Sequence, residues 1–155
     1  MEEENTKRFT QKVGVKRFTE RTSRDTQVHS STFRARWLEG VLVIESLVSK
    51  IDRDDVLMDV FNQSLEKEPE GIILNLQRPR YISSLLIVAI RDIAKRAAEL
   101  DIPFVAVIHP KLRLLLEMFG ITSVVRTGEN LDRTVRELHQ EISRRHAQRG
   151  DNHSA

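Results

Sequence analysis

Two short apolar runs separated by a helical segment constrain the fold of this 155-residue chain most strongly. Ile72–Leu76 and Phe104–Ile108 are each long enough for one buried strand. Between them, apolar residues recur every three or four positions up to about Glu99, which predicts a helix. Strands joined through a helix usually run parallel, because the helix returns the chain to the edge where the first strand began. The chain is therefore predicted to form an α/β fold with helices covering a sheet.

Further strands and helices extend this pattern on both sides. Residues 33–37 alternate between apolar and polar side chains, a turn follows at Glu39-Gly40, and residues 41–44 form a second apolar run. Val124-Val125 is predicted to be a short edge strand. The four predicted helices run from a cap at Asp52 or Asp54 to about Lys67, from near Leu85 to about Glu99, from Pro110 to Phe119, and onward from a cap at Asn130. The prediction is a small mixed β-sheet of about five strands with four helices.

The foldable part of the chain is bounded by polar segments. Residues 1–32 carry too few apolar side chains to offset the entropy of ordering, so we expect a flexible extension. Its basic residues are diluted by Glu20 and Asp25, which favours a solvated tail over a nucleic-acid-binding arm. Residues 33–146 are predicted to form one domain, and residues 147–155 a flexible tail.

Composition excludes several classes of protein. The chain has no cysteine, so it has no disulfide, thiolate metal site or cysteine nucleophile. A net charge of +2 is too small to indicate nucleic-acid binding. No apolar run approaches the roughly 20 residues of a membrane span, and no signal-peptide pattern is present. We expect a cytoplasmic protein without a membrane span.

The sequence contains no recognisable catalytic motif. The six glycines occur singly, so no glycine-rich phosphate loop is present, and the five histidines lack the spacing of metal ligands. His109 is interpreted as a connector before Pro110 rather than an active-site residue. Helix capping explains the acidic cluster of Asp52, Asp54 and Asp55 better than cation binding does. We expect no catalytic residue, metal or cofactor. Asn75 is a polar residue within an apolar strand. Two interpretations remain open: its side chain pairs with the adjacent loop, or it lies near a functional surface.

Ser83 and Ser84 are the strongest candidates for a functional site. They lie between a buried strand and the helix that begins near Leu85. A serine at a helix start lies beside unpaired backbone N–H groups, at the positive end of the helix dipole. The same groups would stabilise a phosphate added there. Two interpretations remain open, a helix cap alone or a regulated phosphorylation site.

Three motifs in a fixed order point to a known family. The strand Ile72–Leu76 contains Asn75, the loop Tyr81-Ile82-Ser83-Ser84-Leu85-Leu86 follows it, and Leu115-Leu116-Glu117-Met118-Phe119-Gly120-Ile121 comes after the second strand. This order and spacing resemble the STAS domain family, the anti-sigma factor antagonists and their relatives, over about residues 33–145. The resemblance implies a STAS-like fold and a regulatory protein-interaction domain rather than an enzyme.

The resemblance also implies a phosphorylation site. In the family, the first serine of an aromatic-apolar-Asp-Ser-Ser/Thr-Gly loop is phosphorylated by a partner kinase. Matched position by position, that serine is Ser84, and Ser83 is the runner-up in a shifted frame. The sequence departs from the family because Ser83 replaces the aspartate and Leu86 replaces the glycine. Leu86 is expected to hinder the approach of a kinase.

The implied partner is an anti-sigma factor or serine kinase with an ATP-binding, histidine-kinase-like fold, in a partner-switching pathway that regulates transcription. One helix face cannot bury four consecutive apolar residues, so some of residues 85–88 are expected to contact the partner. The predicted contact surface comprises Tyr81, Ser83, Ser84, Leu85, Leu86, Ile87 and Val88. Two alternatives are a non-phosphorylated STAS scaffold, stressosome-like or self-associating, and an accessory subunit of a transport system.

Overall fold

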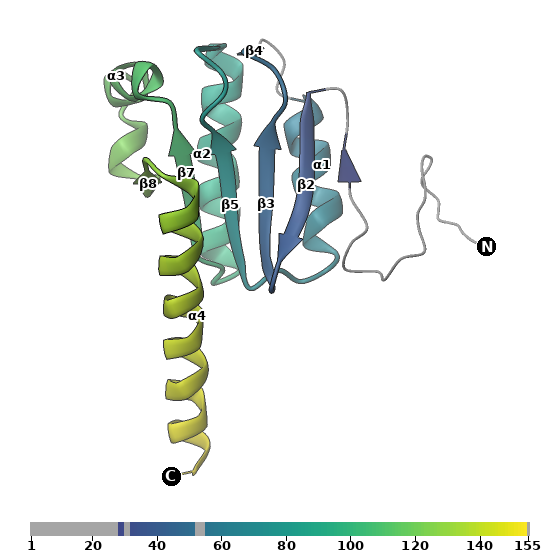
Figure 1. Ribbon diagram of the computed structural model, residues 1–155, viewed down its shortest axis with the longest axis vertical. Helices are drawn as coiled ribbons and strands as arrows, with labels where there is room; N and C mark the ends of the chain where they lie inside the picture. Colours follow the sequence, from purple (N-terminus) through teal and green to yellow (C-terminus); the bar gives the residue numbers. More distant parts are fainter. Residues whose placement is uncertain (1–27, 30–31, 52–54, 155) are drawn as a thin grey trace, which may run out of the picture.

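A mixed six-stranded sheet forms the centre of the computed structural model, which describes residues 28–29, 32–51 and 55–154 (Figure 1). The strands lie in the order β1-β2-β3-β5-β7-β8. The antiparallel part contains β1, β2 and β3, whereas β3, β5, β7 and β8 run parallel to one another. The bounds are β1 (Val28–His29), β2 (Phe33–Leu38), β3 (Val41–Ser46), β5 (Gly71–Leu76), β7 (Phe104–Ile108) and β8 (Thr127–Gly128).

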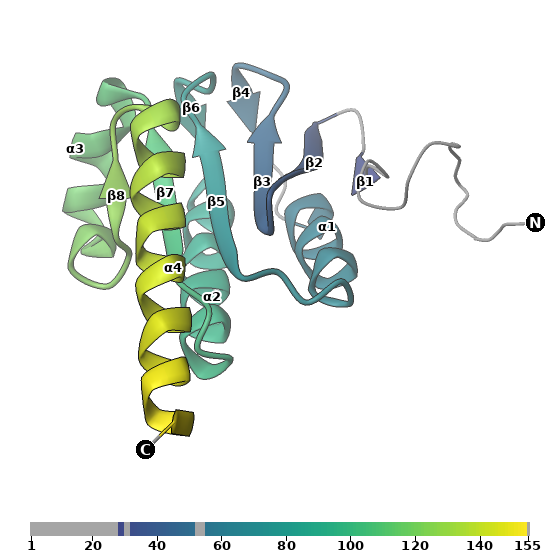
Figure 2. The same ribbon diagram turned by 60° about the horizontal axis from the view of Figure 1, so that its bottom comes forward.

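Four helices cover the two faces of this sheet, so the predicted α/β architecture is confirmed. The helices are α1 (Asp55–Leu65), α2 (Ser84–Glu99), α3 (Pro110–Met118) and α4 (Leu131–Ser154). The first three share one core with alternate strand residues such as Ile72 and Leu74. The intervening residues, such as Ile73, pack with Leu138 and Ile142 of α4 on the opposite face. Figure 2 shows α4 on the face opposite α1 and α2.

A second, very small sheet joins the segments that precede α1 and α2. It pairs β4 (Lys50–Ile51) with β6 (Tyr81–Ile82) in parallel. Ile51 and Ile82 are both buried. Two-residue strands are too short to show a hydrophobic period, so the sequence did not predict them. Their pairing fixes the position of the chain immediately before Ser83.

The prediction of a strand at Val124-Val125 is wrong. Gly120 has a φ of 74°, a left-handed conformation that ends α3, and a 3₁₀ turn, η2 (Ile121–Ser123), follows it. The backbone N–H groups of Val124 and Val125 both donate to the carbonyl of Ile121, at 3.0 and 2.8 Å. Because these donors serve the turn, they are not available to a sheet, and the edge strand forms two residues later as β8.

The chain ends also differ from the expected boundaries. The predicted flexible tail from residue 147 is instead helical, because α4 continues to Ser154 and projects beyond the sheet (Figure 1). Ala147, Gln148 and Arg149 are good helix formers, and no proline interrupts them. At the other end, β1 lies within the predicted extension and pairs with β2. Residues 1–27, 30–31 and 52–54, which include the predicted caps Asp52 and Asp54, lie outside the described residues.

Candidate functional site

Ser83 is the N-cap of α2. Its backbone is extended, and its hydroxyl oxygen accepts a hydrogen bond from the backbone N–H of Leu86 at 3.2 Å. Its own N–H donates to the carbonyl of Ile51 in β4 at 2.9 Å. The cap therefore satisfies one helix donor and ties the start of α2 to the small sheet.

Ser84 is the first residue of α2 and is exposed. Among the described residues, neither its hydroxyl nor the backbone N–H groups of Ser84 and Leu85 take part in a hydrogen bond. These N–H groups belong to the first turn, where a helix has no internal acceptors for them. The first turn also contains no acidic residue. The position can therefore accommodate an anion without repulsion from its own helix.

Three residues near Ser84 in the sequence have exposed, largely apolar side chains. The exposed fractions are 50% for Tyr81, 59% for Leu85 and 43% for Val88. Leu85 and Val88 lie three positions apart and so share a side of the helix. The ammonium of Lys50 lies 5.5 Å from the ring centroid of Tyr81, within cation–π distance. We call Tyr81, Ser84, Leu85 and Val88 the α2 tip surface.

Two residues of the predicted contact surface lie elsewhere. Leu86 and Ile87 are 0% and 2% exposed and belong to the core beneath the sheet. Leu86 shares the inward face of α2 with Ile90 and Ile93, because residues four and seven positions apart lie on one side of a helix. In this fold neither side chain can touch a partner, which corrects the prediction. The burial of Leu86 also means that its side chain does not cover Ser84, contrary to the expected hindrance.

A shallow polar depression lies where β3 and β5 end, and Asn75 was its only lining residue singled out from the sequence. Its volume is about 350 Å³. Asn75 accepts a hydrogen bond from the backbone N–H of Gln77 at 3.1 Å, so it pairs with the adjacent loop and also lines this depression. Glu45 accepts from Arg36 at 2.8 Å and lies 3.2 Å from Arg34. The depression is lined by Glu45, Ser46, Asn75, Gln77, Arg78 and Arg80. These residues come from separate segments, which is why no single motif reveals the depression.

His109 has a structural role at the start of α3. His109 is the N-cap of α3, and its Nδ1 accepts from the backbone N–H of Lys111 at 3.0 Å, as expected for a connector. In the part of the chain that the structure describes, no cluster of three or more histidine or acidic side chains is arranged to hold a metal ion. Over the same residues, no helix has the length and apolar character needed to cross a membrane.

Comparison with solved structures identifies the fold. An anti-sigma factor antagonist from Mycobacterium paratuberculosis superimposes with a TM-score of 0.63 at 15% sequence identity, over 70% of this chain and 93% of that one. The NMR structure of the protein TM1081 gives a TM-score of 0.59 at 18% identity, over 84% and 98% of the two chains. The chain therefore has the STAS fold of an anti-sigma factor antagonist. No protein-family model matches the sequence, and no curated protein matches it.

Proposed function

We propose that this protein is a regulatory interaction domain that binds an anti-sigma factor or a related serine kinase through the α2 tip surface. Its fold is that of an anti-sigma factor antagonist. The observation that carries the proposal is the exposed hydroxyl of Ser84 at the first residue of a helix, flanked by the exposed side chains of Leu85 and Val88. Apolar side chains on a surface favour protein contact.

We propose further that phosphorylation of Ser84 controls this binding. The modification would add about −1.5 to −2 charges, which the unpaired N–H groups of the first turn would stabilise. The same charge would place a strongly hydrated group beside Leu85 and Val88. The partner would then have to desolvate the phosphate in order to cover the apolar residues. Phosphorylation therefore weakens the complex and releases the partner.

The chemistry of the site favours Ser84 over Ser83 as the modified residue. The Ser83 oxygen accepts the N–H of Leu86 and is half-buried, so a kinase would have to displace this bond to reach it. Ser84 is exposed and makes no comparable bond among the described residues. A kinase can therefore reach Ser84 without first opening the helix.

Phosphate transfer tests the modification directly. The protein would be incubated with ATP and each candidate serine kinase, and the modified residue located by mass spectrometry. We expect phosphate on Ser84 in the wild type and in Ser83→Ala, and no phosphate in Ser84→Ala. Phosphate on Ser83 alone, or on neither serine with any cognate kinase, would refute this part of the proposal.

Partner binding is tested separately, with a pair of variants that differ in charge but not in size. Ser84→Asp and Ser84→Asn would be compared with wild type in a pull-down from native lysate and then in titrations with the purified partner. We expect Ser84→Asp to weaken binding at least about tenfold relative to Ser84→Asn. Equal partner affinity of the two variants would contradict the proposal that a negative charge at position 84 controls binding.

A further inference from the structure

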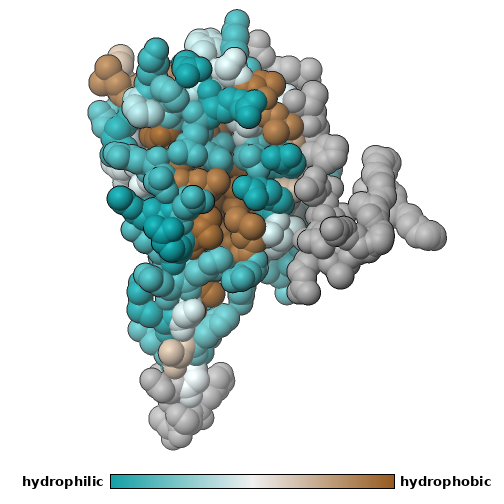
Figure 3. All heavy atoms as spheres, in the orientation of Figure 1, coloured by the Kyte–Doolittle hydropathy of each residue, from teal (hydrophilic) through white to brown (hydrophobic). Residues whose placement is uncertain are grey.

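The depression at the ends of β3 and β5 lies between the two segments that connect the main sheet to the small sheet. One segment joins β3 to β4, and the other joins β5 to β6. Two hydrogen bonds tie them together, from Nη1 of Arg78 to the carbonyl of Leu47 at 3.3 Å and from the backbone N–H of Arg80 to the carbonyl of Ser49 at 2.9 Å. Hydrophilic side chains lie over these strand ends at the top of Figure 3. In open α/β sheets, small ligands bind outside the carboxyl ends of parallel strands, and β3 and β5 are parallel.

Two arginines give this depression an excess of positive charge. Arg78 and Arg80 line it, and neither guanidinium forms an ion pair with any residue that the structure describes. Glu45 is the acidic residue of the described lining, and its Oε1 already contacts Arg36 at 2.8 Å and Arg34 at 3.2 Å. The charge of Glu45 is therefore neutralised by arginines that do not line the depression. Guanidinium groups without an ion pair are well suited to bind oxyanions, because they present paired N–H donors.

One neutral side chain of the lining is also available as a donor. Oδ1 of Asn75 accepts the backbone N–H of Gln77 at 3.1 Å, which leaves the side-chain NH₂ of Asn75 without an acceptor among the described residues. In contrast, Nε2 of Gln77 donates to the carbonyl of Glu129 at 3.1 Å, and the hydroxyl of Ser46 donates to the carbonyl of Val48 at 2.8 Å. The lining therefore offers an amide donor from Asn75 beside the two guanidinium groups.

We propose that this depression binds a phosphate group, either free phosphate or the phosphate of a small molecule. A phosphate dianion matches the charges of both arginines, whereas a carboxylate matches only one of them. Its oxygens can accept from both guanidinium groups and from the amide of Asn75. The volume of about 350 Å³ lies at the lower end of the range for small-molecule sites, which indicates a ligand with few atoms.

The phosphate site is separate from the α2 tip surface. Tyr81, Ser84, Leu85 and Val88 do not line the depression, so this inference does not depend on the proposed function. The side chains of Arg78 and Arg80 are exposed to solvent, which weakens their attraction for an anion. For inorganic phosphate, we therefore expect a dissociation constant in roughly the millimolar range.

NMR titrations of isotope-labelled protein with inorganic phosphate and with glycerol phosphate test the proposal. They would be run at about pH 8, where phosphate is largely dianionic, with sodium chloride keeping the ionic strength constant. We expect saturable shifts of the side-chain amide of Asn75 and of the backbone amides of Gln77 and Arg78. Acetate should bind at least about tenfold more weakly. Tighter binding of glycerol phosphate would assign the site to a phosphorylated small molecule, and equal or tighter binding of inorganic phosphate would assign it to the free ion.

Matched variants locate the site. Arg78→Gln and Arg80→Gln should each raise the dissociation constant at least about tenfold, because each removes a charged donor. Arg91→Gln is the control and should leave it unchanged, since Arg91 is an exposed arginine of α2 with no ion pair among the described residues. Far-ultraviolet circular dichroism would establish that each variant is folded.

Four outcomes would overturn the proposal. The shifts could fail to saturate up to about 50 mM phosphate, or acetate could bind as tightly as phosphate. The variants Arg78→Gln and Arg80→Gln could bind phosphate as tightly as wild type. Finally, shifts centred on the backbone amides of Ser84 and Leu85, with none at Asn75, would place the anion at the start of α2 instead of in the depression.

Discussion

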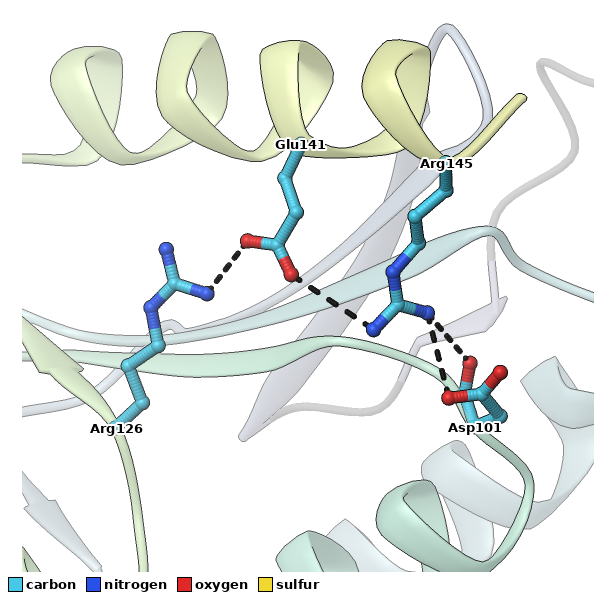
Figure 4. Close-up of polar contacts among 4 residues, drawn as sticks. All are labelled: Asp101, Arg126, Glu141 and Arg145. Carbon is cyan, nitrogen blue, oxygen red and sulfur yellow. Dashed lines mark hydrogen bonds and ion pairs between the residues drawn. The ribbon is translucent and has the colours of Figure 1, made fainter. Parts of the chain in front are cut away.

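The guanidinium of Arg126 lies 2.7 Å from the carboxylate of Glu141, joining the segment before β8 to α4 (Figure 4). The other oxygen of Glu141 lies 3.9 Å from Arg145, which also donates to the backbone carbonyl of Asp101 at 3.0 Å. Four residues from three separate segments thus hold α4 over the parallel part of the sheet. Glu141 is the central member of this network.

Removing the charge of Glu141 should loosen α4. The Arg126 side chain is 48% exposed, which limits the contribution of each pair, so we expect Glu141→Gln to lower the free energy of unfolding by about 0.5–1 kcal/mol. Urea denaturation measures this loss, which should shrink in high salt because ions screen the pairs. Glu137→Gln is the matched control, since Glu137 is exposed on the same helix and has no ion pair among the described residues. Equal losses for both variants would contradict the assigned role.

The two serines at the start of α2 should differ in their effect on stability. Ser83→Ala removes the bond to the N–H of Leu86 and should cost about 1 kcal/mol in the free energy of unfolding. Ser84→Ala removes an exposed hydroxyl and should change stability by less than about 0.5 kcal/mol. Thermal and urea denaturation of the two variants compare them directly. A greater loss of stability from Ser84→Ala than from Ser83→Ala would contradict the assignment of Ser83 as the N-cap.

The neighbouring leucines at the start of α2 should separate stability from partner binding. Leu86 is fully buried, so Leu86→Ala should lower the free energy of unfolding by about 2–5 kcal/mol. Leu85 is 59% exposed, so Leu85→Ala should leave stability nearly unchanged. In titrations with the partner, Leu85→Ala should weaken binding although the protein is fully folded. Unchanged partner affinity of Leu85→Ala would contradict the proposal that Leu85 contacts the partner.

Gly71 permits α4 to lie close to the start of β5. A Cβ added there would meet side-chain atoms of Leu138 at 3.0 Å and of Ile142 at 3.2 Å. Gly71→Ala should therefore destabilise the protein by about 1–3 kcal/mol through overpacking. Gly150, within the projecting end of α4, has nothing within 4 Å of such a Cβ, and Gly150→Ala should increase helix content slightly. Circular dichroism with urea denaturation distinguishes the two variants, and a stabilised Gly71→Ala would contradict the packing.

The hydrophobic pattern was sufficient to predict the strands and helices that form the two cores. Ile72 and Phe104 begin runs that become adjacent parallel strands, and the helix between them caps at Ser83 as its sequence suggests. Asn130 caps α4 as predicted, with its side-chain oxygen accepting from the N–H of Arg133 at 2.8 Å. These features depend on side-chain periodicity and local hydrogen bonds, which a sequence displays directly.

The candidate site could be predicted only in part. The sequence indicated Ser84 and its apolar neighbours, but four consecutive apolar residues do not reveal which of them face the core. The orientation of α2 against the sheet decides this, and it buries Leu86 and Ile87 while leaving Leu85 and Val88 exposed. The small sheet that positions Ser83 was also unpredictable, because thirty residues separate Ile51 from Ile82.

By itself, the sequence determined the α/β class, the order of the main strands and helices, and a serine at the start of a helix. Only the tertiary structure decided which apolar residues stay exposed on α2 and α3, where the last strand forms, and which segments meet at the depression. The physical reason is that periodicity and capping act over a few neighbouring residues, whereas exposure depends on which distant segment packs against each side chain.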